Sequence, residues 1–214
     1  MRFYSSTIGK KIIVAVTGVV MLGFVVGHLA GNLQVFLGPE KLNEYAAFLK
    51  REPLLLWGTR IALLVSILLH VVATVQLTRL NRLSRPIPYQ RYEVLEANVA
   101  SRIMMWSGLF LLVYIVYHLL HLTGGLTHPQ FSPTDVYSNV ITGFHVWYVS
   151  VFYILGMISL GYHLYHGIWS VFQTLGLNHP KFNCYRRVFA IVSASLISLG
   201  YISIPVAVLM GVLR

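Results

Sequence analysis

The chain has 214 residues, of which 57% are hydrophobic and only 10% are charged. A soluble domain carries about 25% charged residues, so the composition excludes an ordinary soluble protein and indicates one that lies largely in lipid. The single cysteine, Cys184, excludes a disulfide framework and an iron–sulfur cluster held by cysteines of this chain.

Five long apolar runs dominate the sequence, and Arg60 is the only acidic or basic residue inside them. They are Ile12–Leu37, Leu54–Leu77, Ile103–Leu126, Gly143–Leu177 and Val188–Leu213. Each reaches the roughly 20 residues that a helix needs to cross a bilayer, and the first is too long for a signal peptide. The sequence therefore predicts an all-α integral membrane protein, a single domain over residues 1–214 with five transmembrane helices. No strand pattern or Gly-rich phosphate loop is present, so we expect no flavin or nicotinamide held by this chain alone.

The basic residues of the loops alternate in number between the two sides of the predicted membrane. One side carries eleven of them: Arg2, Lys10, Lys11, Arg79, Arg82, Arg85, Arg91, Arg102, Lys181, Arg186 and Arg187. The other side carries five, with three glutamates nearby: Lys41, Lys50, Arg51, Arg60 and Arg214, with Glu40, Glu44 and Glu52. The positive-inside rule then predicts a cytoplasmic N-terminus and an outer C-terminus. Because the basic residues alternate in this way, the net charge of +10 does not indicate nucleic-acid binding. The basic loops reflect topology alone, or they form a docking face for a cytoplasmic partner.

Four histidines fall at two depths in the predicted bundle. His28 and His118 each lie sixteen residues after the inner boundary of their helix, or about 24 Å at 1.5 Å per residue. His70 and His163 lie nine and eleven residues from the inner boundary, or roughly 14–17 Å. The first four helices thus carry two His pairs at two heights, each pair split between two helices. This pattern is typical of bis-histidine ligation of two b-type haems in a four-helix bundle.

The sequence offers two further observations on these sites. No Cys-x-x-Cys-His motif occurs, which argues against covalent haem attachment. Small residues flank the histidines, and they suit either a porphyrin lying against a helix or close helix–helix contact: Gly23, Gly27, Gly31, Gly161 and Gly167.

"YHLLH" and "YHLYH" each place a second histidine three residues after the first. Residues at this spacing are neighbours on one helix surface, so both cannot bind one iron from opposite faces. Depth favours His118 over His121 and His163 over His166, leaving the second histidines for haem propionates, for proton transfer or for plain interfacial hydrogen bonds. The remaining three, His128, His145 and His179, are predicted to be surface residues. The fifth helix has no histidine, and we expect it to kink at Pro205 and to pack outside the haem bundle, against lipid or another protomer.

In their order and spacing, "SSTIGKK", "GHLAGNLQVFLGPEKLNEYAAFL", "SRIMMWSG", "YHLLH" and "YHLYHGIWSVFQTLG" carry a resemblance over nearly the whole chain. The sequence resembles the membrane anchors of succinate:quinone oxidoreductases and fumarate reductases, in the form with five helices and two b haems (the cytochrome b558 group). The resemblance implies that His28 and His118 bind the outer haem iron, and His70 and His163 the inner one. Some relatives seem to have Asn in place of the second histidine of the fourth helix, which also favours His163.

The resemblance also implies partners and substrates. A flavoprotein with covalent FAD and an iron–sulfur subunit would dock on the cytoplasmic face of a bacterial inner membrane, and the anchor would exchange electrons with quinone, expected to be menaquinone. The expected propionate partners are Lys10, Lys11, Ser101, Arg102, His121 and His166. The expected quinone-site residues are Asn32, Gln34, Glu44 and Arg60 near the outer haem, and Trp169 and Gln173 near the inner one.

Two alternatives stay open. One is a haem anchor of another quinone-linked oxidoreductase, of the hydrogenase or formate dehydrogenase type. The other is a metal-ion transporter whose intramembrane histidines bind zinc, although transport would favour carboxylates beside them and none lies inside these helices.

Overall fold

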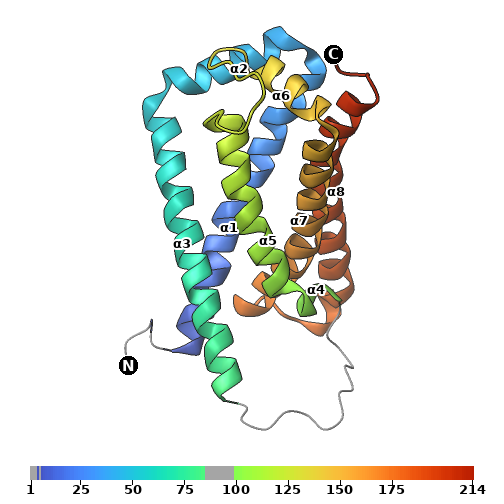
Figure 1. Ribbon diagram of the computed structural model, residues 1–214. Coiled ribbons are helices and arrows are strands. Elements are labelled where there is room, and N and C mark those ends of the chain that lie inside the picture. The colour runs from blue at the N-terminus through green and yellow to red at the C-terminus, as the bar shows by residue number, and fades with distance from the viewer. Residues whose placement is uncertain (1–3, 5, 85–98) are drawn as a thin grey trace.

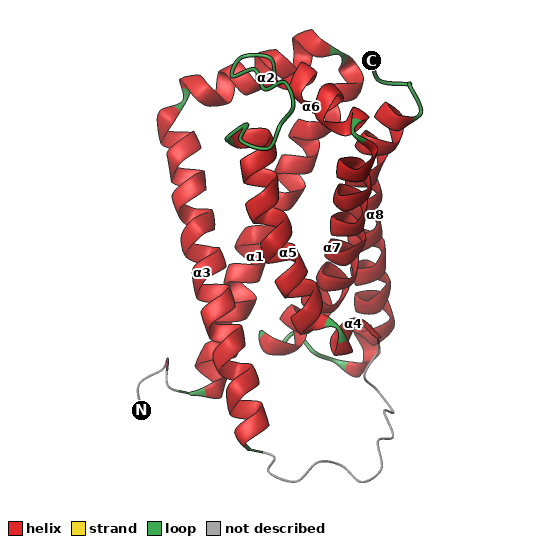
Figure 2. Ribbon diagram, in the orientation of Figure 1, coloured by secondary structure: helices red, strands yellow, loops and turns green. Residues whose placement is uncertain are grey.

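The computed structural model describes residue 4, residues 6–84 and residues 99–214, and this part of the chain is helical without strands (Figure 2). Five segments are long and apolar enough to span a membrane: Thr7–Leu37, Pro53–Leu83, Val99–Thr123, Trp147–Thr174 and Pro180–Leu209. They run up and down beside one another, so that α1 begins and α8 ends at opposite ends of the molecule (Figure 1). The predicted set of five spanning helices is confirmed. Three of the counted basic residues, Arg2, Arg85 and Arg91, lie outside the described residues.

The spanning helices are joined by shorter helical pieces, several of them on the end where α8 finishes (Figure 1). The α-helices are α1 (Thr7–Asn32), α2 (Pro39–Arg51), α3 (Pro53–Leu83), α4 (Val99–Arg102), α5 (Met104–His118), α6 (Val136–His145), α7 (Trp147–Thr174) and α8 (Asn183–Leu209). Two 3₁₀ turns, Leu33–Leu37 and Pro180–Phe182, and one π turn, Leu119–Thr123, complete the described helical structure.

Local sequence explains where these helices begin. Ser6 caps α1 by accepting a hydrogen bond from the Gly9 amide at 2.9 Å. Proline occupies the first turn of α2 and of α3, where its missing N–H costs nothing. Asp135 caps α6 by accepting from the Ser138 amide at 3.0 Å. That amide, together with the Asn43 side chain, holds the pKa of the Asp135 carboxyl below its ordinary value.

The fourth apolar run does not form one continuous helix, contrary to the prediction for Gly143–Leu177. It divides at Val146, whose backbone is extended, into α6 and α7. The break would leave the carbonyl of Phe144 without a helical donor, and the Ser150 hydroxyl donates to it at 2.6 Å. The membrane-spanning part therefore begins at Trp147, and α6 packs at the end of the bundle against α2, α7 and α8.

The third run also departs from a regular helix. After His118 the chain continues as a π turn, in which the Gly124 amide donates to the Leu119 carbonyl at 2.7 Å. A π turn holds more residues than an α turn, so it changes the direction of His121 relative to His118.

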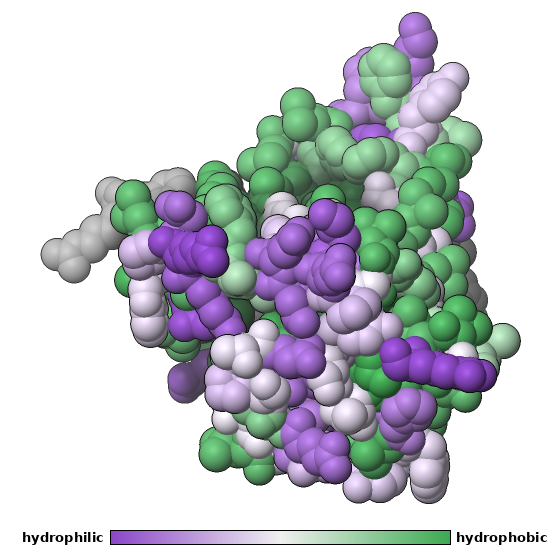
Figure 3. Space-filling view, turned by 90° about the horizontal axis from the view of Figure 1, so that it is seen from above, coloured by the Kyte–Doolittle hydropathy of each residue, from purple (hydrophilic) through white to green (hydrophobic). Residues whose placement is uncertain are grey.

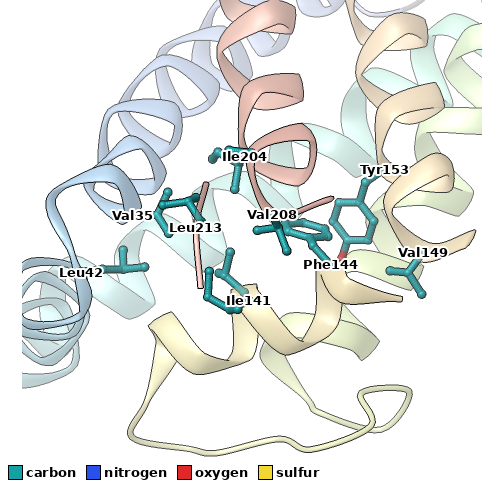
Figure 4. Packing of buried hydrophobic residues seen from close by; sticks show 11 residues of the cluster. Val35, Leu42, Ile141, Phe144, Val149, Tyr153, Ile204, Val208 and Leu213 are labelled. Atoms are coloured by element: carbon teal, nitrogen blue, oxygen red, sulfur yellow. The ribbon is translucent and has the colours of Figure 1, made fainter. Parts of the chain in front are cut away.

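Each principal contact between spanning helices involves α1 or α7. α1 lies against α3, α5 lies against α7, and α7 lies against α8, while α1 also contacts α7 and α8. The fifth spanning helix is thus not simply outside the bundle, as the sequence predicted, because one face of it packs on α1. A hydrophobic cluster closes one end, where α2, α6, α7 and α8 meet around Val35, Phe144, Tyr153 and Val208 (Figure 4).

The sides of the bundle expose large apolar side chains that a water-soluble fold would bury. Examples from four helices are Val16, Val19, Leu64, Leu68, Leu109, Val113, Leu196 and Leu199. Seen from above the end that carries α2 and α6, hydrophilic residues gather over the middle of the face and hydrophobic residues surround much of it (Figure 3). The protein has the surface of a multi-pass membrane protein.

Candidate functional site

The rings of His28 and His118 face each other across the bundle. Their centroids are 6.0 Å apart and their planes make an angle of 82°. Metal–imidazole bonds of about 2 Å would place the centres of two rings on opposite sides of one metal atom about 6 Å apart. In the described part of the chain, α1 and α5 make at most marginal backbone contact. These two helices therefore approach each other through side chains, as they would around a group held between them.

Aromatic rings surround this outer pair. Phe24 stacks on His28 at 5.1 Å, and Tyr114 stacks on His118 at 5.9 Å. Tyr201 of α8 lies 6.2 Å from His28 and donates a hydrogen bond to the Val25 carbonyl at 2.8 Å. The fifth spanning helix thus contributes a residue to the outer site, which the sequence prediction did not include.

His70 and His163 form a second pair on α3 and α7. The two rings lie close enough to interact electrostatically. The Thr17 hydroxyl lies 3.0 Å from Nδ1 of His70, and the Ser107 hydroxyl lies 3.1 Å from Nδ1 of His163. Each histidine of this inner pair is therefore held by a hydroxyl from a different helix.

These two hydroxyls indicate which nitrogen of each ring carries the proton. Thr17 is 2.7 Å from the Ile13 carbonyl, and Ser107 is 3.0 Å from the Met104 carbonyl. A hydroxyl has one proton, and donating it to the helix carbonyl leaves the oxygen as an acceptor for an N–H at Nδ1. Nε2 then keeps its lone pair, which is the form of imidazole that binds a metal.

The glycines near the histidines separate into two groups. A side-chain carbon at Gly23, Gly27 or Gly167 would meet nothing within 4 Å. Gly31 instead packs against the Tyr45 ring, and Gly161 against the Ser198 hydroxyl. The first group borders open space, as a flat porphyrin requires, whereas the second group lets a neighbouring side chain approach closer than a Cβ would allow.

Two further glycines lie directly against the inner histidines. A side-chain carbon at Gly18 would lie 3.7 Å from Cε1 of His70, and one at Gly108 would lie 3.5 Å from Cε1 of His163. Within residues 6–84 and 99–214, no group of three or more His, Cys, Asp or Glu side chains is arranged to hold a bare metal ion. Two pairs of imidazoles, each split between two helices, fit two haems, each of which needs only two axial ligands from protein.

The second histidines lie in different surroundings. His121 is fully buried, with Nδ1 3.0 Å from the Tyr153 hydroxyl and Nε2 without a hydrogen-bond partner. This burial does not favour the propionate contact expected of His121. His166 is only partly buried, and its expected propionate role stays a prediction.

One of the three predicted surface histidines is buried. His128 donates from Nε2 to the Asn139 carbonyl at 2.8 Å and accepts at Nδ1 from the Gln130 amide at 3.0 Å, so the prediction for it was wrong. The Gln130 amide lies in the same loop and the Asn139 carbonyl lies in α6, so the backbone of both covers this loop histidine. His145 and His179 are exposed, as predicted.

The remaining expected propionate partners lie in the first turns of α1 and in α4, with different exposures. Lys10 is buried and donates to the Tyr4 carbonyl at 2.8 Å, which leaves two of its three protons for another acceptor. Lys11 and Arg102 are exposed, and Ser101 is partly buried.

The residues expected at an outer quinone site have different contacts. Near the outer pair, the Asn32 amide donates to the His28 carbonyl at 2.7 Å, and Gln34 lies in the following 3₁₀ turn. Glu44 is exposed and paired with Lys41 at 3.2 Å, while the Arg60 guanidinium lies 5.0 Å from the Trp57 ring. These contacts tie Glu44 and Arg60 to their own helices.

The two residues expected near an inner quinone also differ. Trp169 is partly buried, and the Arg186 guanidinium lies 4.9 Å from the centre of the Trp169 ring. Gln173 is exposed. Arg186 is buried, and it donates to the Leu177 carbonyl and to Asn178 and Asn183.

Sequence reasoning missed the hydroxyl residues that hold the histidines. They are Thr17, Ser107 and Tyr153. A polar side chain inside an apolar span is costly and usually has a purpose, so a depth comparison of these residues with the histidines was the available signal. Protein families, curated proteins and solved structures were compared with the chain, and none matches it.

Proposed function

We propose that this chain is the di-haem cytochrome b membrane subunit of a succinate:quinone oxidoreductase. In this role it would anchor a flavoprotein and an iron–sulfur subunit on the cytoplasmic face of a bacterial inner membrane, and pass electrons between them and membrane quinone. The observation that carries the proposal is the placing of two histidine pairs on four different helices, with the rings of His28 and His118 6.0 Å apart and each inner ring held at Nδ1 by a hydroxyl. The motifs quoted from the sequence supply the succinate-linked part of the proposal.

The residues present would hold the cofactors without further ligands. His28 and His118 would bind one iron, and His70 and His163 the other. When bound, two b-type haems would supply reversible one-electron transfer between the two halves of the membrane. Thr17 and Ser107 would keep the Nδ1 protons of the inner ligands in place, so that each Nε2 stays available.

Other residues of the chain would shape the surroundings. The apolar helix faces exclude water and lower the local dielectric, which strengthens electrostatic effects at the site. Gly23 and Gly27 leave the surface of α1 open beside His28. Lys10, buried at the inner end, would place a positive charge where a propionate needs one.

A reduced-minus-oxidised optical spectrum of the purified chain, with haem counted per polypeptide, tests the proposal. Two b-type haems per chain are expected. A chain without haem would refute the assignment, and a stoichiometric content of zinc in its place would favour the transporter alternative.

A second experiment separates the proposal from other haem anchors. In membranes that hold the assembled complex, succinate is expected to reduce the haems of this chain. Reduction by formate or hydrogen, with no response to succinate, would assign the chain to the alternative class.

A further inference from the structure

A chain of three side chains leads away from the outer iron ligand. Nδ1 of His118 lies 3.4 Å from the Tyr153 hydroxyl, and the same hydroxyl lies 3.0 Å from Nδ1 of His121. The tyrosine comes from α7 and the two histidines from the third spanning segment. Tyr153 is buried in the cluster that closes the bundle (Figure 4).

The direction of these hydrogen bonds follows from the role proposed for His118. An imidazole that binds iron through Nε2 carries its proton on Nδ1, so His118 donates to the Tyr153 oxygen. Tyr153 then has its single proton free for His121, whose Nδ1 accepts it. The shorter second distance agrees with this order, since an O–H···N bond is ordinarily shorter than an N–H···O bond.

The far end of the chain is sealed. His121 has no exposed surface, and a side-chain carbon at Gly143 would come within 2.8 Å of its Cε1. Its ring stacks on Tyr117 at 5.5 Å and lies 5.0 Å from the His128 ring. Because Nδ1 of His121 accepts the tyrosine proton, the ring's own proton lies on Nε2. This nitrogen is buried and has no hydrogen-bond partner. Leaving such a group unpaired is costly.

The inner ligands are held differently. Thr17 and Ser107 each give their proton to a carbonyl of their own helix, so no second side chain stands behind them. His118 instead contacts Tyr153, which contacts His121, and the π turn after His118 sets the direction of the His121 side chain. The two sites therefore differ in what fixes the ring.

We propose that Tyr153 and His121 are positioning residues of the outer site, which fix the tautomer and ring orientation of His118 and raise its electron donation to the iron. An acceptor on the far nitrogen makes a ligating imidazole more basic, and a hydroxyl that is itself donating is a better acceptor because bonds in a chain polarise one another. This inference rests on the proposed function, since it requires iron at His118.

The test uses Tyr153→Phe, which removes the hydroxyl and keeps the ring, in the full chain. Haem-resolved redox titration and low-temperature electron paramagnetic resonance are the measurements. One haem signal alone is expected to change, with its midpoint potential shifted upward, because a less basic imidazole stabilises ferric iron less. Retention of that haem is expected to weaken by about 10–100-fold. The altered signal should be the one that His28→Leu removes.

Two further variants keep the test decisive. Tyr114→Phe is the matched control, because its ring stacks on His118 while its hydroxyl makes no hydrogen bond to a ring nitrogen within the described residues; it should leave both potentials unchanged. His121→Phe keeps a planar ring and removes the acceptor, so it should shift the same signal in the same direction. If Tyr153→Phe does not accumulate in membranes, His121→Phe alone provides the test.

The outcomes separate the two proposals. Wild-type chain without haem would overturn both. Two haems in the wild type, with unchanged potentials in Tyr153→Phe and His121→Phe, would overturn the positioning role and leave the proposed function standing. An equal shift of both haem signals would mean a general disturbance of packing and would also overturn the positioning role.

Discussion

Replacing Thr17 by valine tests whether a hydroxyl fixes the inner iron ligand. Valine is also branched at Cβ and has nearly the same shape as threonine, so packing on α1 should change little. The substitution removes the oxygen 3.0 Å from Nδ1 of His70. The N–H at that nitrogen then loses the hydroxyl acceptor and keeps only the Val14 carbonyl, which also bonds the His70 ring.

The size of the effect follows from this single bond. A single hydrogen bond contributes about 0.5–1.5 kcal/mol net, and each 1.4 kcal/mol is tenfold in an equilibrium constant, so retention of the inner haem should weaken by about 2–12-fold. The assay is haem content per polypeptide after graded detergent washing, combined with redox titration to show which haem is lost. We expect loss of the inner haem and retention of the outer one.

Thr74→Val is the matched control for this experiment. The Thr74 hydroxyl donates to the backbone carbonyl of His70 at 2.6 Å and does not contact its ring. It should retain both haems like the wild type. Equal retention in Thr17→Val and Thr74→Val would show that the hydroxyl bond to the ring has no role in holding the ligand, and the tautomer argument would be wrong.

Three further predictions concern the ligands, the open space and one helix cap. His118→Leu and His163→Leu should each lower the haem count from two to one and abolish different signals in the redox titration, and loss of both haems from either variant would contradict independent sites. Gly27→Leu places a side chain where nothing lies within 4 Å, so it should reduce the outer haem without lowering the thermal stability of the haem-free chain, since leucine favours a helix over glycine by about 1 kcal/mol. Asp135→Ala should lose about 0.5–2 kcal/mol through the α6 cap, whereas Asp135→Asn should keep most of it. Because the folded pKa of Asp135 is depressed, its charge stabilises the fold above the ordinary carboxyl pKa of about 3.9 and loses that effect as pH falls through the folded value; thermal unfolding of the Asn variant should lack this dependence.

The helices illustrate which parts of the fold a sequence can predict. Apolar run length predicted five spans because bilayer thickness sets a minimum length, and the structure has five. The break at Val146 was missed because the residues around it are as apolar as the rest of the run. It depends on Ser150 reaching the Phe144 carbonyl, a local contact that hydropathy does not contain.

The histidines show the same division. A rise of 1.5 Å per residue placed His28 and His118 at one level, and the structure brings their rings to 6.0 Å. The prediction that His128 lies at the surface was wrong because the path of its loop, which the sequence does not give, brings it to the Asn139 carbonyl of α6 and the Gln130 amide.

By itself the sequence determined that this is a membrane protein, how many spans it has and that His28 and His118 share one level, because each follows from composition or from distance along a helix. Only the tertiary structure decided which helix faces meet, and so which hydroxyl holds which ring. It also turned His121 away from the open space and against Tyr153, since the π turn and the packing of α6 and α7 fix that direction. The rotation of each helix about its own axis depends on the helices that pack against it. The residues of one apolar run do not determine those contacts.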